Sequence, residues 1–211
     1  MIKVENIKTY GWEAAIRGMR NPMNSWAKSD TRYGYETYIG ENDLDLMQRL
    51  YKAGTEHRKY LRMITVTMDI TAPLYWWKEY DTYKVGTVAN SCSTMHKIHD
   101  KEFTLDDFSY EQLDDVSMEV LVHTVNHLNE MRNRYLRAKN NGADGFILKH
   151  YWWQMIQLLP SSYNQRRTVQ FTYENVMAMI KQRENHKLDE WREFVDIVKD
   201  LPYVREVLQH D

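Results

Sequence analysis

The chain has 211 residues, enough for a substantial core but not for two full domains, so we expect a single domain over residues 1–211. Its 28 lysines and arginines nearly balance 30 aspartates and glutamates, so no long-range field favours nucleic acid or an anionic membrane as a partner. The single cysteine excludes an internal disulfide, and no apolar segment resembles a signal peptide or could span a bilayer, so we expect a cytoplasmic protein.

Two segments show the alternation of apolar and polar residues that is typical of strands. The first is residues 1–8, and the second and stronger one is residues 61–70, "LRMITVTMDI". Residues 24–41 are rich in Tyr, Ser, Asp and Gly without periodicity, which predicts a loop.

Three helices are predicted in this half of the chain. The first covers residues 12–19 and ends at Asn21-Pro22, because a residue before proline disfavours helix. The second covers residues 41–54, with Asn42 as its cap and Gly54 at its end. The third begins at Pro73 and runs to Tyr80, and its aromatic side chains are expected to be buried.

The rest of the chain predicts mainly helices. Ser109 and Gln112 fit a capping box at the start of the longest helix, which is expected to end near Asn140–Gly142. Residues 145–160 are apolar nearly all round, which predicts a helix that is central in the domain or in an assembly. Two more helices are predicted, from Thr172 to Arg183 and through Leu188 to Val198. The stripe of the longest helix that is expected to be buried consists of Leu113, Val116, Val120, Thr124, Leu128, Met131 and Tyr135.

The predicted elements favour the α+β class, because helices dominate and the strands do not alternate with them as βαβ units. Nothing in the sequence indicates a linker, an internal repeat or a low-complexity segment.

Metal and thiol chemistry have only weak signals. His123 and His127 have the spacing of a metalloprotease pair, but Thr-Val-Asn between them supplies no general base, so we predict no metal site. Cys92 has basic neighbours in sequence, but a lone cysteine is more often a small packing residue than a nucleophile. We assign no catalytic residue from these patterns.

Phosphate binding, if it occurs, must use side chains or helix N-termini, because no glycine-rich phosphate loop is present. Each basic candidate is also explained, when taken alone, as a solvated surface charge. The candidates are Lys84, Arg166, Arg167, Arg183 and Lys187.

The order of several features resembles the flavin-dependent thymidylate synthases. A turn with His57, "GTEHRKYL", precedes a strand that ends at Ala72-Pro73, and a short aromatic helix follows. Thr82-Tyr83-Lys84 then stands where that family has Arg-His-Arg, and Cys92 stands at the position of its serine. Farther along, Arg183 ends a helix where the family has Leu-x-Leu-Arg, and His186 and Lys187 lie near the position of its histidine.

The sequence also departs from the family pattern. Asn90 stands in place of a glutamate, Thr94 in place of an arginine, and Asp189 near the position of a glutamine. At the Arg-His-Arg position only Lys84 is basic, and a hydroxyl does not replace a bidentate arginine–phosphate contact.

The resemblance implies a small, mostly antiparallel sheet packed with long helices, and a homotetramer that shares FAD between subunits. It implies reductive methylation of dUMP to dTMP with methylenetetrahydrofolate and NADPH, with the flavin carrying the difficult step. It also implies that Lys84 and Arg183 hold phosphates, that Asn90 contacts the pyrimidine edge, and that Cys92 and Ser93 donate to the nucleotide. The cofactor ligands that it implies are His57, Thr82, Tyr83, Lys84, His186 and Lys187.

Two other functions stay open at this point. The same fold with a degenerate motif could serve as a non-catalytic nucleotide-binding or assembly protein, or as an enzyme of another pyrimidine nucleotide. The loss of Arg-His-Arg favours the non-catalytic protein, whereas Arg183 and the polar segment at residues 86–94 favour an enzyme of pyrimidine nucleotides, most simply the synthase.

Overall fold

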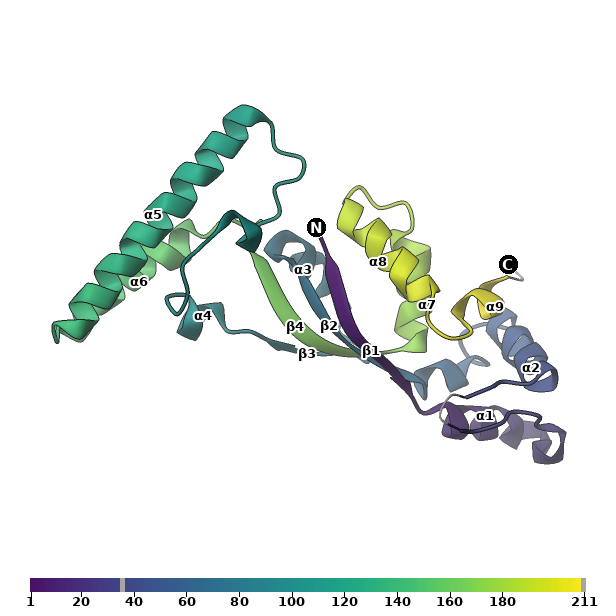
Figure 1. Cartoon of the computed structure of the whole chain (residues 1–211). Helices are drawn as coiled ribbons and strands as arrows, with labels where there is room; N and C mark the ends of the chain where they lie inside the picture. Colours follow the sequence, from purple (N-terminus) through teal and green to yellow (C-terminus); the bar gives the residue numbers. More distant parts are fainter. Residues whose placement is uncertain (35–36, 210–211) are drawn as a thin grey trace. The chain divides into compact units, whose positions relative to one another are not determined.

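The computed structural model describes residues 1–34 and 37–209, so residues 35–36 of the predicted loop lie outside the described part. It is an α+β fold with a small antiparallel sheet, as predicted, whose strand order is β1-β2-β4-β3 (Figure 1). The strands are β1 (Lys3–Tyr10), β2 (Thr65–Pro73), β3 (Val88–Ser91) and β4 (Asn164–Thr172). The helices are α1 (Trp12–Arg20), α2 (Glu41–Lys52), α3 (Leu74–Tyr80), α4 (Thr94–Lys97), α5 (Asp115–Asn140), α6 (Gly145–Leu158), α7 (Tyr173–Arg183), α8 (Asp189–Lys199) and α9 (Val204–Leu208).

Contacts divide the chain into two compact units. The first unit consists of residues 1–3, 70–81 and 90–167, and the second of residues 4–69, 82–89 and the described part of 168–211. Every strand contributes residues to both units, which is why no linker in the sequence marks the division. A single domain over residues 1–211 stays a prediction.

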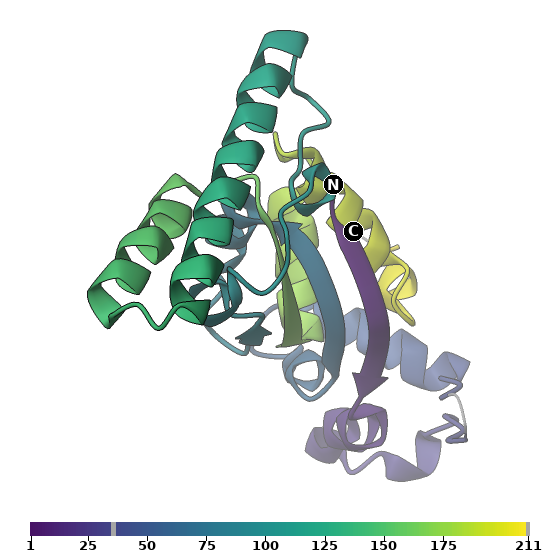
Figure 2. The same ribbon diagram turned by 60° about the vertical axis from the view of Figure 1, so that its left-hand side comes forward.

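In the first unit, α5 and α6 pack side by side (Figures 1 and 2). The predicted stripe of α5 is correct only toward its C-terminal end, because Val116 and Val120 are 72% and 63% exposed. The first half of α5 carries two apolar stripes. The stripe that packs against α6 is not the predicted stripe with Val116 and Val120. The buried residues of α5 are Leu121, Val125, Leu128 and Met131.

The predicted start of α5 is also wrong. Ser109 is buried, where its hydroxyl accepts a hydrogen bond from the N-terminal amine of Met1 at 2.8 Å and donates to Asn164 at 2.9 Å. The helix begins at Asp115 instead, and the carboxylate of Asp114 caps it by accepting the Ser117 N–H at 2.8 Å. Ser109 therefore matches the capping-box pattern but does not cap a helix; it makes contacts with residues distant in the sequence.

Helix α6 is not central in its unit, although its apolar character allowed that prediction. Only Met155 is fully buried, while Phe146 is 83% exposed and Ile147, Trp153 and Leu158 are each about two-fifths exposed or more. Within the described residues, no helix combines the length and the apolar character that crossing a bilayer requires.

The aromatic helix α3 is confirmed, and its indole and phenol rings are buried as expected. Trp76, Trp77 and Tyr80 are each no more than 2% exposed and pack on one another with centroid distances of 4.9–5.3 Å. The strand before it, β2, begins at Thr65, so the predicted strand over residues 61–70 started too early: Leu61 belongs to a 3-10 turn at Lys59–Arg62.

In the second unit, α7 and α8 pack together, and α9 packs against α2 (Figure 1). Helix α7 begins directly after Thr172, next to its predicted start, and Thr172 caps it: its hydroxyl accepts the Asn175 N–H while the Asn175 side chain accepts the Thr172 N–H. The helix predicted through Leu188 to Val198 is α8, and its residues Trp191, Phe194, Val195 and Val198 are each at most 1% exposed.

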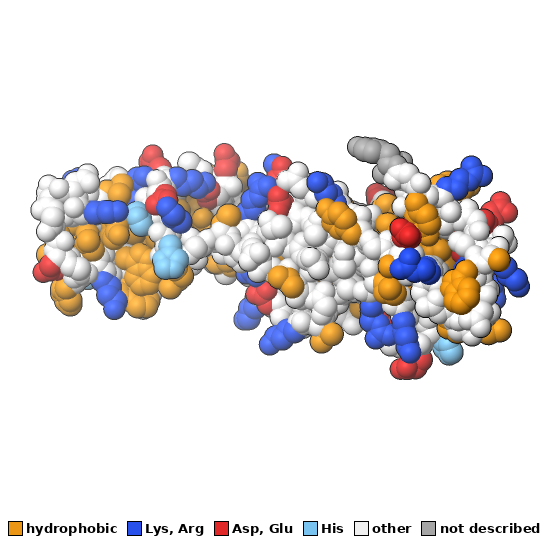
Figure 3. Space-filling view, turned by 90° about the horizontal axis from the view of Figure 1, so that it is seen from below, with side chains coloured by type: hydrophobic (Ala, Val, Ile, Leu, Met, Phe, Trp, Pro, Cys, Tyr) orange, Lys and Arg blue, Asp and Glu red, His pale blue; other side chains and the backbone are white. Residues whose placement is uncertain are grey.

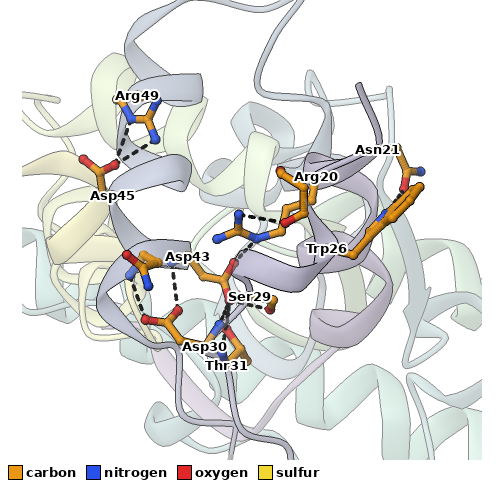
Figure 4. Close-up of polar contacts among 11 residues, drawn as sticks. Arg20, Asn21, Trp26, Ser29, Asp30, Thr31, Asp43, Asp45 and Arg49 are labelled. Atoms are coloured by element: carbon orange, nitrogen blue, oxygen red, sulfur yellow. Dashed lines mark hydrogen bonds and ion pairs between the residues drawn. The ribbon is translucent and has the colours of Figure 1, made fainter. Parts of the chain in front are cut away.

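A buried polar cluster fixes the segment before α2 (Figure 4). The inaccessible carboxylate of Asp43 accepts Arg20 Nε at 2.6 Å and the hydroxyls of Ser29 and Thr31 at 2.7 and 2.6 Å. Asn42 does not cap α2: the carboxylate of Asp30 does, by accepting the N–H groups of Asn42 at 2.9 Å and Asp43 at 3.1 Å. Because Asp30 lies twelve positions before Asn42 in the sequence, no local sequence pattern predicts this cap. Gly54 follows the helix in the left-handed region, at φ +99°.

Candidate functional site

Cys92 and Ser93 lie in the first unit, where β3 leads into α4. The backbone N–H of Cys92 donates to the Arg166 carbonyl at 2.9 Å, and its carbonyl accepts Gln165 Nε2 at 2.9 Å, so β4 holds this residue by its backbone. Its thiol side chain is exposed, contrary to the interpretation as a buried packing residue. The Ser93 hydroxyl caps α4 by accepting the His96 N–H at 3.1 Å, and its own hydrogen stays available for donation.

Both residues line a cavity of about 460 Å³ in the first unit. The cations at this cavity are Lys97, Lys101 and Arg166, and the acids are Asp100, Asp106 and Asp107. Lys97 pairs with Asp100 at 2.8 Å, which lowers the pKa of that carboxyl, and Lys101 pairs with Asp107. The charges therefore balance, and the cavity does not by itself select an anion. Asn90 is exposed on β3 and does not line it.

Arg183 forms the best-defined part of the predicted site, in the second unit. Its Nε donates to the Tyr83 hydroxyl at 3.0 Å, and its guanidinium carbon lies 5.6 Å from the centre of the Tyr83 ring and 4.9 Å from that of Trp191. The Tyr83 hydroxyl donates in turn to Gln182 at 2.8 Å. The rings of Tyr83 and Trp191, together with the Tyr83 hydroxyl, therefore hold the guanidinium in one orientation.

The turn that carries Thr82, Tyr83 and Lys84 is anchored to α7. Asn175 donates to the Val85 carbonyl at 2.9 Å, and Gly86 adopts a φ of +75° that a side chain would strain. Thr82 and Lys84 are exposed on this turn. Within residues 1–34 and 37–209, the Lys84 ammonium has no hydrogen-bond or ion-pair partner.

The other predicted cofactor ligands are His186, Lys187 and His57, and they do not all contact the cluster of Tyr83, Arg183 and Trp191. His186 is half-buried, 6.2 Å from the Trp191 ring centre, and its Nδ1 accepts the Leu188 N–H at 3.2 Å. Lys187 is exposed beside it in the chain. His57 is exposed in the turn after Gly54, and the described contacts do not join it to Arg183. The structure thus brings together Tyr83, Arg183 and His186, with Trp191 between them.

Trp191 was not predicted as part of the site, because no pattern in the sequence links it to Arg183. Arg167, a phosphate candidate, has a structural role instead: it lies 4.2 Å above the Trp77 ring, pairs with Asp81 at 2.8 Å and donates to Gln165 at 2.9 Å.

Metal ligands do not cluster in the described residues, where no group of three or more His, Cys, Asp or Glu side chains could hold an ion. His123 and His127 lie on the exposed side of α5, and the nearest carboxylate to His127 is that of Glu130, at 4.0 Å.

Comparison with known proteins gives a match in structure but not in sequence. No protein-family model matches the chain, and no curated protein matches it. A crystal structure of thymidylate synthase X from Helicobacter pylori with FAD and dUMP aligns with a TM-score of 0.68 at 17% identity, over 100% of this chain and 98% of that one. A second structure of the flavin-dependent thymidylate synthase from H. pylori, also complexed with FAD and dUMP, gives a TM-score of 0.68 at 16% identity, over 98% of both chains. The chain therefore has the fold of the flavin-dependent thymidylate synthases.

Proposed function

We propose that this protein is a divergent flavin-dependent thymidylate synthase, which converts dUMP to dTMP with methylenetetrahydrofolate, FAD and NADPH. The fold supports this proposal, because the two similar H. pylori structures contain FAD and dUMP. Fold alone does not imply function, so the proposal depends on the residues of the site.

The observation that carries the proposal is the fixed guanidinium of Arg183 beside the turn at residues 82–84. An arginine held against Tyr83 and Trp191 has a fixed orientation and loses little side-chain freedom on binding. Such a group suits the phosphate of a nucleotide. Lys84 adds an ammonium group on the same turn as Tyr83, and we assign both cations to phosphate binding.

The donors at the predicted cofactor positions fit a phosphate-bearing ligand such as FAD. Thr82 and Lys84 are exposed on an anchored turn, and His57 and Lys187 are exposed donors as well. Lys84 is the single cation at the Arg-His-Arg position, so we expect FAD to bind less tightly than it would with two arginines there. When bound, the flavin would supply the hydride chemistry, and the residues of this chain would bind and orient the ligands.

Asn90, Cys92 and Ser93 keep their predicted roles toward the nucleotide. An asparagine amide offers both donors and an acceptor, which matches a pyrimidine edge, and the hydroxyl of Ser93 retains a hydrogen to donate. We assign no nucleophile to the reaction.

We also propose that the chain forms a homo-oligomer, a tetramer of two dimers. Figure 3 shows hydrophobic side chains gathered over the α5–α6 pair at the left of that view, and Phe146 and Trp153 of α6 are 83% and 39% exposed. Exposed apolar groups of this kind mark interfaces, and a second copy of the chain is the simplest partner.

Calorimetric titration of dUMP tests the role of Arg183. Arg183→Ala should raise the Kd for dUMP about 10- to 100-fold, the effect of losing a charge-assisted contact. Arg134→Ala is the matched control, because Arg134 is an exposed arginine of α5 whose partner is Glu130. Equal affinities of the wild type and Arg183→Ala, with both proteins folded, would contradict the proposal.

A further inference from the structure

A second cleft lies in the second unit, where the end of α2 and its following turn meet α7 and α9. Its volume is about 750 Å³, which is within the range of small-molecule sites. Tyr51, Met177 and Ile180 line it and are at most 8% exposed, so part of its wall is apolar and fixed. None of the ligands predicted from the sequence lines this cleft.

The charges around the cleft are strongly unbalanced. Its charged lining residues are the five cations Lys52, Arg58, Lys181, Lys199 and Arg205 and the single acid Glu184. The whole chain has a formal net charge of −2, so a concentration of cations at one place is not a consequence of composition.

Three of these cations already have carboxylate partners. Arg58 pairs with Glu174 at 3.4 Å, Lys199 pairs with Glu184, and Arg205 pairs with Asp200 at 2.6 Å. In contrast, Lys52 and Lys181 have no ion-pair or hydrogen-bond partner among the described residues. These two ammonium groups are therefore available to an incoming anion.

The apolar wall adds a second requirement for the ligand. The guanidinium carbon of Arg58 lies 5.4 Å from the centre of the Tyr51 ring, so one end of the cleft presents both an aromatic group and a cation. A ligand that covers this wall and reaches the lysines would have a flat apolar body and a phosphate or carboxylate group.

The cleft borders the Arg183 cluster but does not include Arg183 itself: Gln182, which accepts the Tyr83 hydroxyl, lines the cleft. Successive residues of a helix turn by about 100°, so Lys181 and Arg183, two positions apart, point to different sides of α7. Arg183 contacts Tyr83 and Trp191, neither of which lines the cleft.

We propose that this cleft is a binding site for a small organic anion with an aromatic body, distinct from the nucleotide site at Arg183. Lys52 and Lys181 bind its anionic group, and Tyr51, Met177 and Ile180 contact its apolar part.

Calorimetric titration with 1-naphthyl phosphate tests this proposal, with 1-naphthol and inorganic phosphate as probes that each lack one half of the ligand. We expect one 1-naphthyl phosphate per chain and at least tenfold weaker binding of the other two probes. Lys52→Ala/Lys181→Ala should weaken 1-naphthyl phosphate about tenfold or more. Lys8→Ala/Lys28→Ala, which removes two other exposed lysines, and Arg183→Ala should both leave its affinity unchanged.

Three outcomes would overturn the proposal. One is the absence of saturable binding by 1-naphthyl phosphate, and another is equal affinity in the wild type and Lys52→Ala/Lys181→Ala. The third is loss of binding in Arg183→Ala with retention in the double lysine variant, which would assign the anion to the Arg183 cluster.

Discussion

At the scale of single residues, the buried carboxylate of Asp43 stabilises the fold through its hydrogen bonds. Burial alone would raise its pKa, but hydrogen bonds from Thr31, Ser29 and Arg20 outweigh burial and hold the pKa below its ordinary value. A carboxyl whose pKa is lower in the folded state stabilises the fold above its unfolded pKa. This stability is lost as the pH falls through the folded pKa.

We predict that Asp43→Ala lowers the free energy of unfolding by about 3–5 kcal/mol at neutral pH, because Arg20 is left buried without its partner. The difference from the wild type should shrink as the pH falls below the ordinary pKa of an aspartate, about 3.9, and through the still lower pKa of the folded state. Urea unfolding at a series of pH values measures both effects. Asp45→Ala on the same helix is the control: its pair with Arg49 is exposed, so it should cost less than about 1 kcal/mol. Equal costs of the two variants would contradict the role of Asp43.

A second prediction at this scale concerns Cys92. Its backbone is held by β4 while its thiol is exposed, so Cys92→Ser should change the free energy of unfolding by less than about 0.5 kcal/mol. Because a hydroxyl also donates a hydrogen bond, we expect dUMP affinity and any turnover to be largely retained. Complete loss of turnover in a folded Cys92→Ser protein would identify the thiol as a nucleophile and contradict this assignment.

At the scale of elements, β4 organises the first unit through Gln165 and Arg167. The side-chain amide of Gln165 donates to the Cys92 carbonyl, and the backbone carbonyl of Gln165 accepts the Trp77 indole N–H at 2.9 Å. Arg167 covers the Trp77 ring and pairs with Asp81 at the end of α3. This strand therefore fixes both the aromatic helix and the segment that carries Cys92.

We predict that Arg167→Ala lowers the free energy of unfolding by about 1–3 kcal/mol, because it removes a cation–π contact together with charge-assisted hydrogen bonds. Arg167→Lys should recover only part of this loss, since an ammonium does not reproduce the planar stacking and the two directed donors. Thermal and urea unfolding of the three proteins would measure the series. Full stability of Arg167→Lys would show that charge alone is sufficient.

Elements with strong local patterns could be predicted, and contacts between distant residues could not. The helix start at Thr172, the aromatic helix and the alternation of β2 are local, and the structure confirms them apart from boundaries. Strands β3 and β4 and helices α4 and α9 were missed, although Gln165, Val169 and Phe171 alternate as buried residues along β4. The cap from Asp30, the choice between two stripes on α5 and the approach of Trp191 to Arg183 depend on tertiary packing, which periodicity does not contain.

At the scale of the whole molecule, the exposed side of α6 carries the proposal of an oligomer. Light scattering at micromolar protein should give a mass above that of one chain, and four chains if the proposed tetramer forms. Phe146→Glu/Trp153→Glu should lower this mass, because charges replace apolar groups at the interface. Met23→Glu, at another exposed apolar residue, should leave it unchanged. A monomeric wild type would rule out the assembly.

We predict above all that this protein binds FAD even though Lys84 is the single basic residue at the Arg-His-Arg position. The absorption spectrum of the purified protein tests it most directly, before and after addition of FAD and removal of unbound flavin by gel filtration. We predict that the visible bands of oxidised flavin remain with the protein after gel filtration, and that Lys84→Ala retains less of them than the wild type. A protein that stays colourless after incubation with FAD would contradict a flavin-dependent synthase.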